Sequence, residues 1–333
     1  MSIQEQVTMF PASESLASEM TQKVSFLKER AFMLKQAREF FEKRGVLEVD
    51  CPALTAAASV DAHIDLIKCQ PFGNQLRFLH SSPEYGMKRL LAIGIGDIYQ
   101  LSHVFRDGEY SARHNPEFMM AEWYRCGFSF EEMMAETCDF ISLFVGDLAV
   151  EMCSYKELFL RYTGINPFEA SSEDCLQYIA KQGQEAPYDP IENTKDDLLS
   201  FIVATFIDPH LGKGCLTVVP YFPPSQAALA KVRSVEGHLV AERFEVFCEG
   251  LELANGYHEL QDVNEQRLRL IEANECRRRL CKEELPIDTY FLEALEMGLP
   301  DSCGVAVGFD RLMMLRCKVQ KLSDVIAWDW QLA

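Results

Sequence analysis

The sequence predicts an α+β domain with helical insertions, and three features of its periodicity support that class. Apolar residues recur at helical spacing over residues 23–44, and Gly45 is a typical place for such a helix to end. Residues 76–125 alternate short β-like runs with one helix, and β character returns over residues 218–256. Between these two stretches, residues 130–215 have mainly helical periodicity.

The rest of the chain completes the predicted order of elements. A charged helix is expected near residues 263–283, and a strand over Gly304–Gly308 precedes a helix over Asp310–Cys317. No internal repeat, low-complexity tract or long linker divides the chain. We therefore expect a loose N-terminal arm over residues 1–22 and a single domain over residues 23–333.

The composition is typical of a soluble globular protein. Of the 333 residues, 48% are hydrophobic and 25% are charged. No run reaches the roughly 18 consecutive apolar residues that a membrane span needs, and residues 1–21 lack the basic and apolar parts of a signal peptide. The twelve cysteines are scattered singly without a C-x-x-C pair, which is typical of buried thiols in a reducing compartment. We expect a cytoplasmic protein without membrane contact.

The charge balance bears on the class of partner. Asp and Glu total 51 against 32 Lys and Arg, which gives a net charge of −19. Binding to a nucleic acid backbone depends on Lys and Arg displacing counterions, so a general nucleic-acid binder is disfavoured. A chain this acidic attracts basic partners. The alternative is that the negative charge serves only to keep the protein soluble.

The most informative segment is a predicted hairpin with a long polar loop that ends at Tyr124. Because strand side chains alternate between faces, Phe118, Met120, Glu122 and Tyr124 share one face, in a row of roughly 20 Å. The guanidinium of Arg106 can neutralise a phosphate. Phe118 can stack on a base, and Glu122 with Tyr124 can hold an ammonium group. The alternative is a surface hairpin with a solvated loop.

A second predicted hairpin brings two carboxylates together. A turn at Glu249-Gly250 places Glu252 opposite Phe247 and Glu245 opposite Ala254. Glu245 and Glu252 then lie on one face as diagonal neighbours, about 7 to 8 Å apart. Two carboxylates at that spacing can share a divalent ion that bridges phosphates. An exposed charged hairpin is the alternative interpretation.

Two further segments contain candidate binding residues. The small residues of 304–308 allow a ligand to approach the backbone closely, and Arg311 follows in the first helical turn, where it can stack over an adenine ring. Ser82 and Pro83 form a typical helix start, as N-cap and first helical residue. Beyond that structural role, Glu84 can hold a substrate ammonium.

Taken in order, these segments resemble the three signature motifs of class II aminoacyl-tRNA synthetases. Lys23–Pro52 resembles motif 1, Phe105–Tyr124 resembles motif 2, and Gly308–Arg311 resembles motif 3. The resemblance implies the catalytic core of that class, an antiparallel β-sheet flanked by helices. It also implies a homodimer, because motif 1 forms the dimer interface in that class.

The lysyl branch of the class gives the closer match. Ser82–Tyr85, His114–Phe118 and Glu252–Gly256 with Glu259 are similar to that branch. Motif 1 begins near residue 24, where those synthetases carry an anticodon-binding domain first, so no such domain is expected here. A core of this kind resembles the elongation factor P (R)-β-lysine ligase family, truncated paralogues of lysyl-tRNA synthetase.

That resemblance implies an activity and a set of roles. The enzyme would activate (R)-β-lysine or lysine with ATP and Mg²⁺ and transfer it to a lysine side chain of elongation factor P, without tRNA. The amino acid would be bound by Ser82, Pro83, Glu84, Glu122, Tyr124 and Glu259. ATP would be bound by Arg106, Asp107, Gly108, His114, Asn115, Phe118, Glu252, Leu253, Gly308 and Arg311. Arg106 and Arg311 would be catalytic, and Glu245 and Glu252 would hold Mg²⁺.

The chain departs from the family pattern in motif 2. Where the family has Phe-Arg-x-Glu, Gly108 replaces the acid and Glu109 follows it. Either Asp107 or Glu109 is expected to take over that role.

Three rival functions remain open at this level. Direct charging of tRNA is disfavoured by the net charge of −19 and by the expected lack of an anticodon-binding domain. Amide synthesis from ammonia, as in the asparagine-forming relatives, requires a cation for a substrate carboxylate, whereas Glu84, Glu122 and Glu259 suit an ammonium. The third rival is an inactive module that binds a basic, tRNA-shaped partner. The residues do not distinguish α-lysine from β-lysine.

Overall fold

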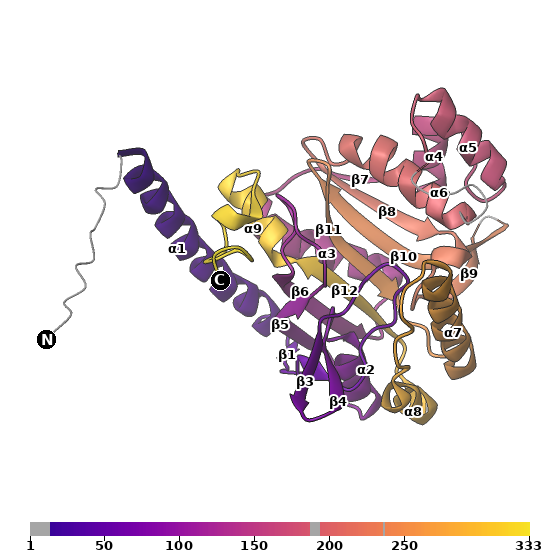
Figure 1. Ribbon diagram of the computed structural model, residues 1–333, viewed down its shortest axis with the longest axis horizontal. Coiled ribbons are helices and arrows are strands. Elements are labelled where there is room, and N and C mark those ends of the chain that lie inside the picture. The colour runs from indigo at the N-terminus through magenta and orange to yellow at the C-terminus, as the bar shows by residue number, and fades with distance from the viewer. Residues whose placement is uncertain (1–13, 187–193, 236) are drawn as a thin grey trace, which may run out of the picture.

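The computed structural model describes residues 14–186, 194–235 and 237–333. Its first helix, α1 (Glu14–Glu42), begins earlier than the predicted residue 23, so the expected arm contains the start of this helix. The remainder of that arm, residues 1–13, lies outside the described residues. The helix ends at Glu42, three residues before the predicted stop at Gly45, which closes the following turn with a φ of +69° that suits glycine. The N-terminal part of α1 extends outward from the rest of the molecule (Figure 1).

A nine-stranded sheet forms the centre of the described part of the chain. Its strand order is β1-β5-β6-β12-β11-β10-β8-β7, with β9 paired to β10. The pairing is antiparallel except for β1 with β5 and β7 with β8, which agrees with the expected sheet. The strands are β1 (Leu47–Glu48), β5 (Ile98–Phe105), β6 (Glu117–Cys126), β7 (Val150–Met152), β8 (Leu216–Phe222), β9 (Val232–Val235), β10 (His238–Cys248), β11 (Leu251–His258) and β12 (Ser302–Gly308).

A smaller sheet, in the order β2-β4-β3, lies beside it (Figure 1). Its strands are β2 (Leu54–Thr55), β3 (Lys68–Phe72) and β4 (Gln75–Leu79). The chain then enters α2 (Glu84–Ala92), which packs on α8 (Thr289–Gly298) through Tyr85 and Phe291. Their rings stack with centroids 4.2 Å apart. This contact fixes α2 beside the open face of the large sheet.

The predicted helical region, residues 130–215, has sequence-encoded helix starts. Ser129, Ser154, Ser171 and Thr194 each form a capping box with the acid three residues later, which satisfies backbone N–H groups at the helix start. The helices are α3 (Phe130–Val145), α4 (Tyr155–Thr163), α5 (Ser172–Lys181) and α6 (Lys195–Ile202). A π-helical turn (Val203–Ile207) and a 3₁₀ turn (Asp208–His210) then lead into β8.

The C-terminal part follows the predicted order. It contains α7 (Val263–Arg279), α8, strand β12 and α9 (Phe309–Cys317). Short 3₁₀ turns occur at Pro224–Gln226 and Leu322–Asp324. Among the helices that the structure describes, none combines the length and the apolar character needed to cross a membrane.

The two faces of the large sheet have different surroundings. On one face, Ala121 and Trp123 of β6 are fully buried in a core shared with α1, α3 and α9. The alternate residues of the same strand, Phe118, Met120, Glu122 and Tyr124, line a cavity on the other face. This confirms the predicted row, and it makes β6 the strand that joins the core to the candidate site.

Candidate active site

A large cavity lies on the open face of the sheet. Its volume is about 860 Å³, which is within the range of small-molecule sites and large enough for a nucleotide together with an amino acid. Of the site residues predicted from the sequence, all but Pro83, Asp107 and Gly108 line it. Segments that are far apart in the sequence therefore meet at one site, as the motif order implied.

One end of the cavity is built around the carboxylate of Glu122. This side chain is 2% exposed, and it accepts hydrogen bonds from the hydroxyls of Ser82 and Tyr124, each at 2.7 Å. Burial, reinforced by the nearby charge of Glu84, raises the pKa of Glu122 to about 8. Neither of its hydrogen-bond partners supplies a positive charge, so an ammonium group from a ligand would stabilise its ionised form.

Ser82 acts differently from the sequence prediction. Helix α2 begins at Glu84 with Pro83 as the N-cap, so the expected positions of Ser82 and Pro83 are each wrong by one residue. The Ser82 hydroxyl nevertheless accepts a hydrogen bond from the backbone N–H of Glu84 at 3.0 Å while it donates to Glu122. The helix start and the buried carboxylate are thus joined by one side chain.

Lys88 lies among the predicted substrate-binding acids, and the sequence analysis did not identify it. Its side chain is 1% exposed, and its Nζ is 2.6 Å from a carboxylate oxygen of Glu84 and 2.5 Å from one of Glu259. Burial alone would lower the pKa of Lys88, but the carboxylates of Glu259 and Glu84 outweigh burial and raise it. The i, i+4 spacing from Glu84 to Lys88 on α2 was the available signal.

Glu259 closes this end of the cavity from the strand β11 side. It is fully buried, and burial raises its pKa against the opposing effect of Lys88. A Cβ at Gly304 would lie 2.3 Å from a ring atom of Tyr124 and 2.4 Å from Oε1 of Glu259. Only glycine fits at residue 304, which explains the small-residue strand noted in the sequence.

Arg106 lies at the other end of the row on β6. Its guanidinium lies over the Phe118 ring, with 5.1 Å between the guanidinium carbon and the ring centroid. It faces the carboxylate of Glu109 at 3.7 Å, and its buried Nε has no hydrogen-bond partner among the described residues. This cation therefore has donor capacity left for an anionic ligand.

The structure separates the two candidate acids of motif 2. Glu109 lines the cavity and faces Arg106, whereas Asp107 does not line it and donates its backbone N–H to the carbonyl of Asp65. Gly108 has a φ of +75°, a turn conformation that favours glycine, and it also lies off the cavity wall. The geometry therefore favours Glu109 over the predicted Asp107 and Gly108.

Arg311 joins the motif 2 loop to strand β11. It donates hydrogen bonds to Nε2 of His114 at 2.8 Å and to the backbone carbonyl of Glu252 at 2.7 Å. Burial and the positive charge of Arg311 lower the pKa of His114, which keeps the ring neutral and Nε2 free to accept. Arg311 is held in place from the start of α9, where Asp310 pairs with Arg30 of α1.

Asn115 supports the same loop through its amide. Its Nδ2 donates to the backbone carbonyl of Glu117 at 2.7 Å, and its Oδ1 accepts from the backbone N–H of Trp330 at 2.9 Å. The predicted ATP contacts Leu253 and Gly308 also line the cavity.

The two predicted metal ligands are neighbours, but their register differs from the prediction. Phe247 pairs with Glu252 as expected, whereas Glu245 pairs with Asn255 rather than Ala254. A β-bulge beside Leu253 causes the shift, and such a bulge leaves no clear mark in the sequence. Burial raises the pKa of Glu245, a shift that Arg243 opposes from 2.6 Å and the charge of Glu252 reinforces.

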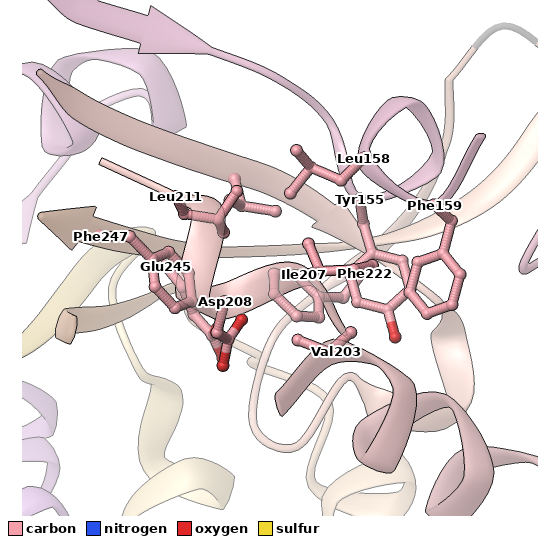
Figure 2. Close-up of a pocket in the computed structure, with 11 residues that line it drawn as sticks. Tyr155, Leu158, Phe159, Val203, Ile207, Asp208, Leu211, Phe222, Glu245 and Phe247 are labelled. Atoms are coloured by element: carbon pink, nitrogen blue, oxygen red, sulfur yellow. The ribbon is translucent and has the colours of Figure 1, made fainter. Parts of the chain in front are cut away.

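A third carboxylate, Asp208, lies near this pair, and the sequence analysis missed it. It borders both the main cavity and a smaller apolar pocket, where Figure 2 shows it beside Glu245. Burial, with the charges of Glu245 and Glu252, raises the pKa of Asp208 to about 8. No group of three or more acidic, histidine or cysteine side chains arranged to hold a metal occurs within the described residues.

Gln266 of α7 was also missed. It is fully buried, it lines the cavity, and neither of its amide atoms has a hydrogen-bond partner among the described residues. A single glutamine in a charged helix gives no signal of such a position.

Comparisons with known proteins agree with the sequence resemblance. The family described as tRNA synthetases class II (D, K and N) matches residues 13–330. The chain is 42% identical to the elongation factor P–(R)-β-lysine ligase of Edwardsiella ictaluri, over 92% of this chain and 95% of the relative. It is 43% identical to the ligase of that name from Proteus mirabilis, with the same coverage. The Haemophilus influenzae (strain PittGG) ligase is 42% identical, over 91% of this chain and 94% of the relative.

Proposed function

We propose, from the premise that the chain belongs to the class II tRNA synthetases (D, K and N) and within them to the elongation factor P–(R)-β-lysine ligase family, that it activates (R)-β-lysine or lysine with ATP and transfers it to elongation factor P. The observation that best supports this function is the asymmetry of the cavity. One end contains the buried carboxylates of Glu122 and Glu259, and the other contains the cations of Arg106 and Arg311. Such a cavity suits ammonium groups at one end and phosphates at the other.

The proposed reaction has two steps. In the first, the amino acid carboxylate attacks the α-phosphorus of ATP, which forms an aminoacyl adenylate and releases pyrophosphate. In the second, the ε-amine of an acceptor lysine attacks the acyl carbon, which forms an amide and releases AMP and a proton. Arg106 would stabilise charge on the α-phosphate, while Glu122, Tyr124 and Glu259 fix the amino acid.

The residues near Glu245 fit a magnesium ion. Mg²⁺ is usually bound by one or two carboxylates together with substrate phosphates and water, so a cage made only of protein ligands is not needed. Glu245 and Glu252 would supply those carboxylates, and Arg243 holds Glu245 in place. When bound, the ion would neutralise phosphate charge during adenylate formation.

The charge and the free thiols of the chain bear on its acceptor and on its location. The acceptor is a lysine side chain of elongation factor P rather than tRNA, because a net charge of −19 disfavours a polynucleotide. We propose a cytoplasmic homodimer, on the basis of the free cysteines and of the resemblance of α1 and its surroundings to motif 1.

Incubation with acceptors tests the proposed transfer. Purified protein, ATP, Mg²⁺ and (R)-β-lysine should increase the mass of elongation factor P by one β-lysyl group, as intact-protein mass spectrometry would show. Elongation factor P with its acceptor lysine changed to arginine should remain unmodified. Transfer to lysine tRNA, with elongation factor P left unmodified, would contradict the proposal.

The pKa of Glu122 predicts a pH dependence. A neutral carboxyl cannot pair with an ammonium, so kcat/KM for the amino acid should rise about tenfold per pH unit from pH 6 towards pH 8, where Glu122 ionises. The measurement is amino-acid-dependent ATP–pyrophosphate exchange at saturating ATP. A flat profile over this range would mean that Glu122 is already ionised in the free enzyme.

The departure from the family pattern in motif 2 can be tested by comparing variants of Glu109 and Asp107. Glu109→Gln should raise KM for ATP several-fold because it removes the acid that faces Arg106, whereas Asp107→Asn should change KM less than about twofold. The ATP dependence of pyrophosphate exchange measures both. The reverse order of effects would assign the role to Asp107.

A further inference from the structure

The amino-acid end of the cavity contains a positive charge of its own. Three carboxylates that the sequence assigns to the substrate, those of Glu84, Glu122 and Glu259, line it together. Lys88 bridges two of them, at 2.6 and 2.5 Å, and leaves Glu122 with hydroxyl partners only. With the acids ionised, the three negative charges and the single positive charge of Lys88 sum to −2.

Lys88 itself is shielded from solvent. Lys88 is 1% exposed, and its Nζ lies 6.0 Å from the ring centroid of Tyr124 and 5.9 Å from that of Phe291. His258 and Cys303 on the adjoining strands β11 and β12, and Tyr124 on β6, also interact electrostatically with Glu259. Tyr85 and Tyr257 interact in the same way with Glu84, and Cys51 with Glu122. Since an unpaired charge is strongly unfavourable in such a buried site, the ligand must match the total charge of this end of the cavity.

We propose that Lys88 is a positioning and specificity residue that sets this end of the cavity to two uncompensated negative charges, so that it matches an amino acid with two ammonium groups. Lys88 pairs with Glu84 and Glu259 and orients them, and the two ammonium groups of a diamino acid then neutralise the remaining negative charge. This inference rests on the proposed function, because it takes the cavity to bind lysine or β-lysine.

Lys88 acts through the three acids and does not bind the substrate itself. Without it, the carboxyl groups of Glu122 and Glu259 would retain their protons to a higher pH, because Lys88 would no longer oppose the negative charge of Glu84. The interaction of Glu84 with Glu122 already acts in this direction, since Glu84 contributes to the raised pKa of Glu122. Removal of Lys88 should therefore change activity as a lower pH does, and not as the loss of a direct substrate contact does.

The experiment compares pH profiles of kcat/KM for lysine in pyrophosphate exchange. Lys88→Met should move the acidic limb of the profile towards higher pH by at least about one pH unit. This shift lowers kcat/KM about tenfold at pH 7 and much less at pH 9. Glu84→Gln should move the acidic limb towards lower pH. The double variant Lys88→Met/Glu84→Gln, whose charge sum is again −2, should return the limb close to its wild-type position even if the rate is reduced.

Arg89→Met is the matched control, because it removes a positive charge from the exposed side of the same helix. Its profile should coincide with that of the wild type. If Lys88→Met does not fold, the Glu84→Gln limb at lower pH and the double-variant limb at the wild-type position still test the charge sum.

The possible failures are distinguishable. If the wild-type protein catalyses no pyrophosphate exchange with any of the amino acids offered, the proposed function itself is contradicted. An active wild type whose variants share one pH profile, or a Lys88→Met variant impaired equally at pH 7 and pH 9, overturns the inference and reduces Lys88 to a packing residue.

Discussion

Glu122→Gln should reduce kcat/KM for lysine or β-lysine by at least about a hundredfold in ATP–pyrophosphate exchange. The substitution keeps the size of the side chain but leaves a substrate ammonium without its buried counter-charge, a loss of about 3 kcal/mol or more. The effect should fall on the amino acid, with KM for ATP little changed, because Glu122 lies at the opposite end of the β6 row from Arg106.

Glu136→Gln provides the control for this substitution. Glu136 is a carboxylate of similar burial that accepts a hydrogen bond from Trp123 on the core side of the same sheet, outside the cavity. It should alter stability without altering KM for the amino acid. Equal losses of amino acid binding in both variants would show that the Glu122 effect is structural.

Arg106→Lys should lower kcat for adenylate formation by about a hundred- to a thousandfold, the range found when one donor to a developing charge is removed. Lysine keeps the positive charge but loses the planar fork of donors and the contact with Phe118. Single-turnover formation of the adenylate measures the step directly.

Arg161→Lys is the corresponding surface control, since Arg161 pairs with Glu151 on β7 and neither residue lines the cavity. It should behave as the wild type. An unchanged rate in Arg106→Lys would mean that the bidentate geometry of Arg106 plays no part in the transition state.

The sequence predicts best where local periodicity fixes the geometry. The period of two on β6 places Phe118, Met120, Glu122 and Tyr124 on one face whatever the neighbours are. The turn at Glu249-Gly250 is also present, with both residues at positive φ. These two local features suffice to place the ends of the site, and the resemblance supplies their order.

What the sequence does not predict depends on contacts across the fold. The bulge that pairs Glu245 with Asn255 arises from how β10 and β11 fit, and Asp208 reaches the site from the end of a helical insertion. The sequence does not single out Lys88, because a lysine four residues after an acid usually marks an exposed helix pair. Only the tertiary structure shows that it is buried against Glu259 from another strand.

The most direct test of the account is ATP–pyrophosphate exchange by the purified protein, offered (R)-β-lysine, lysine, aspartate or no amino acid in turn. The protein should catalyse exchange with the diamino acids and none with aspartate, whose side chain would add a negative charge to a cavity end already lined by Glu84, Glu122 and Glu259. Exchange with aspartate, or no exchange with any amino acid, would contradict the assignment of this cavity to lysine activation.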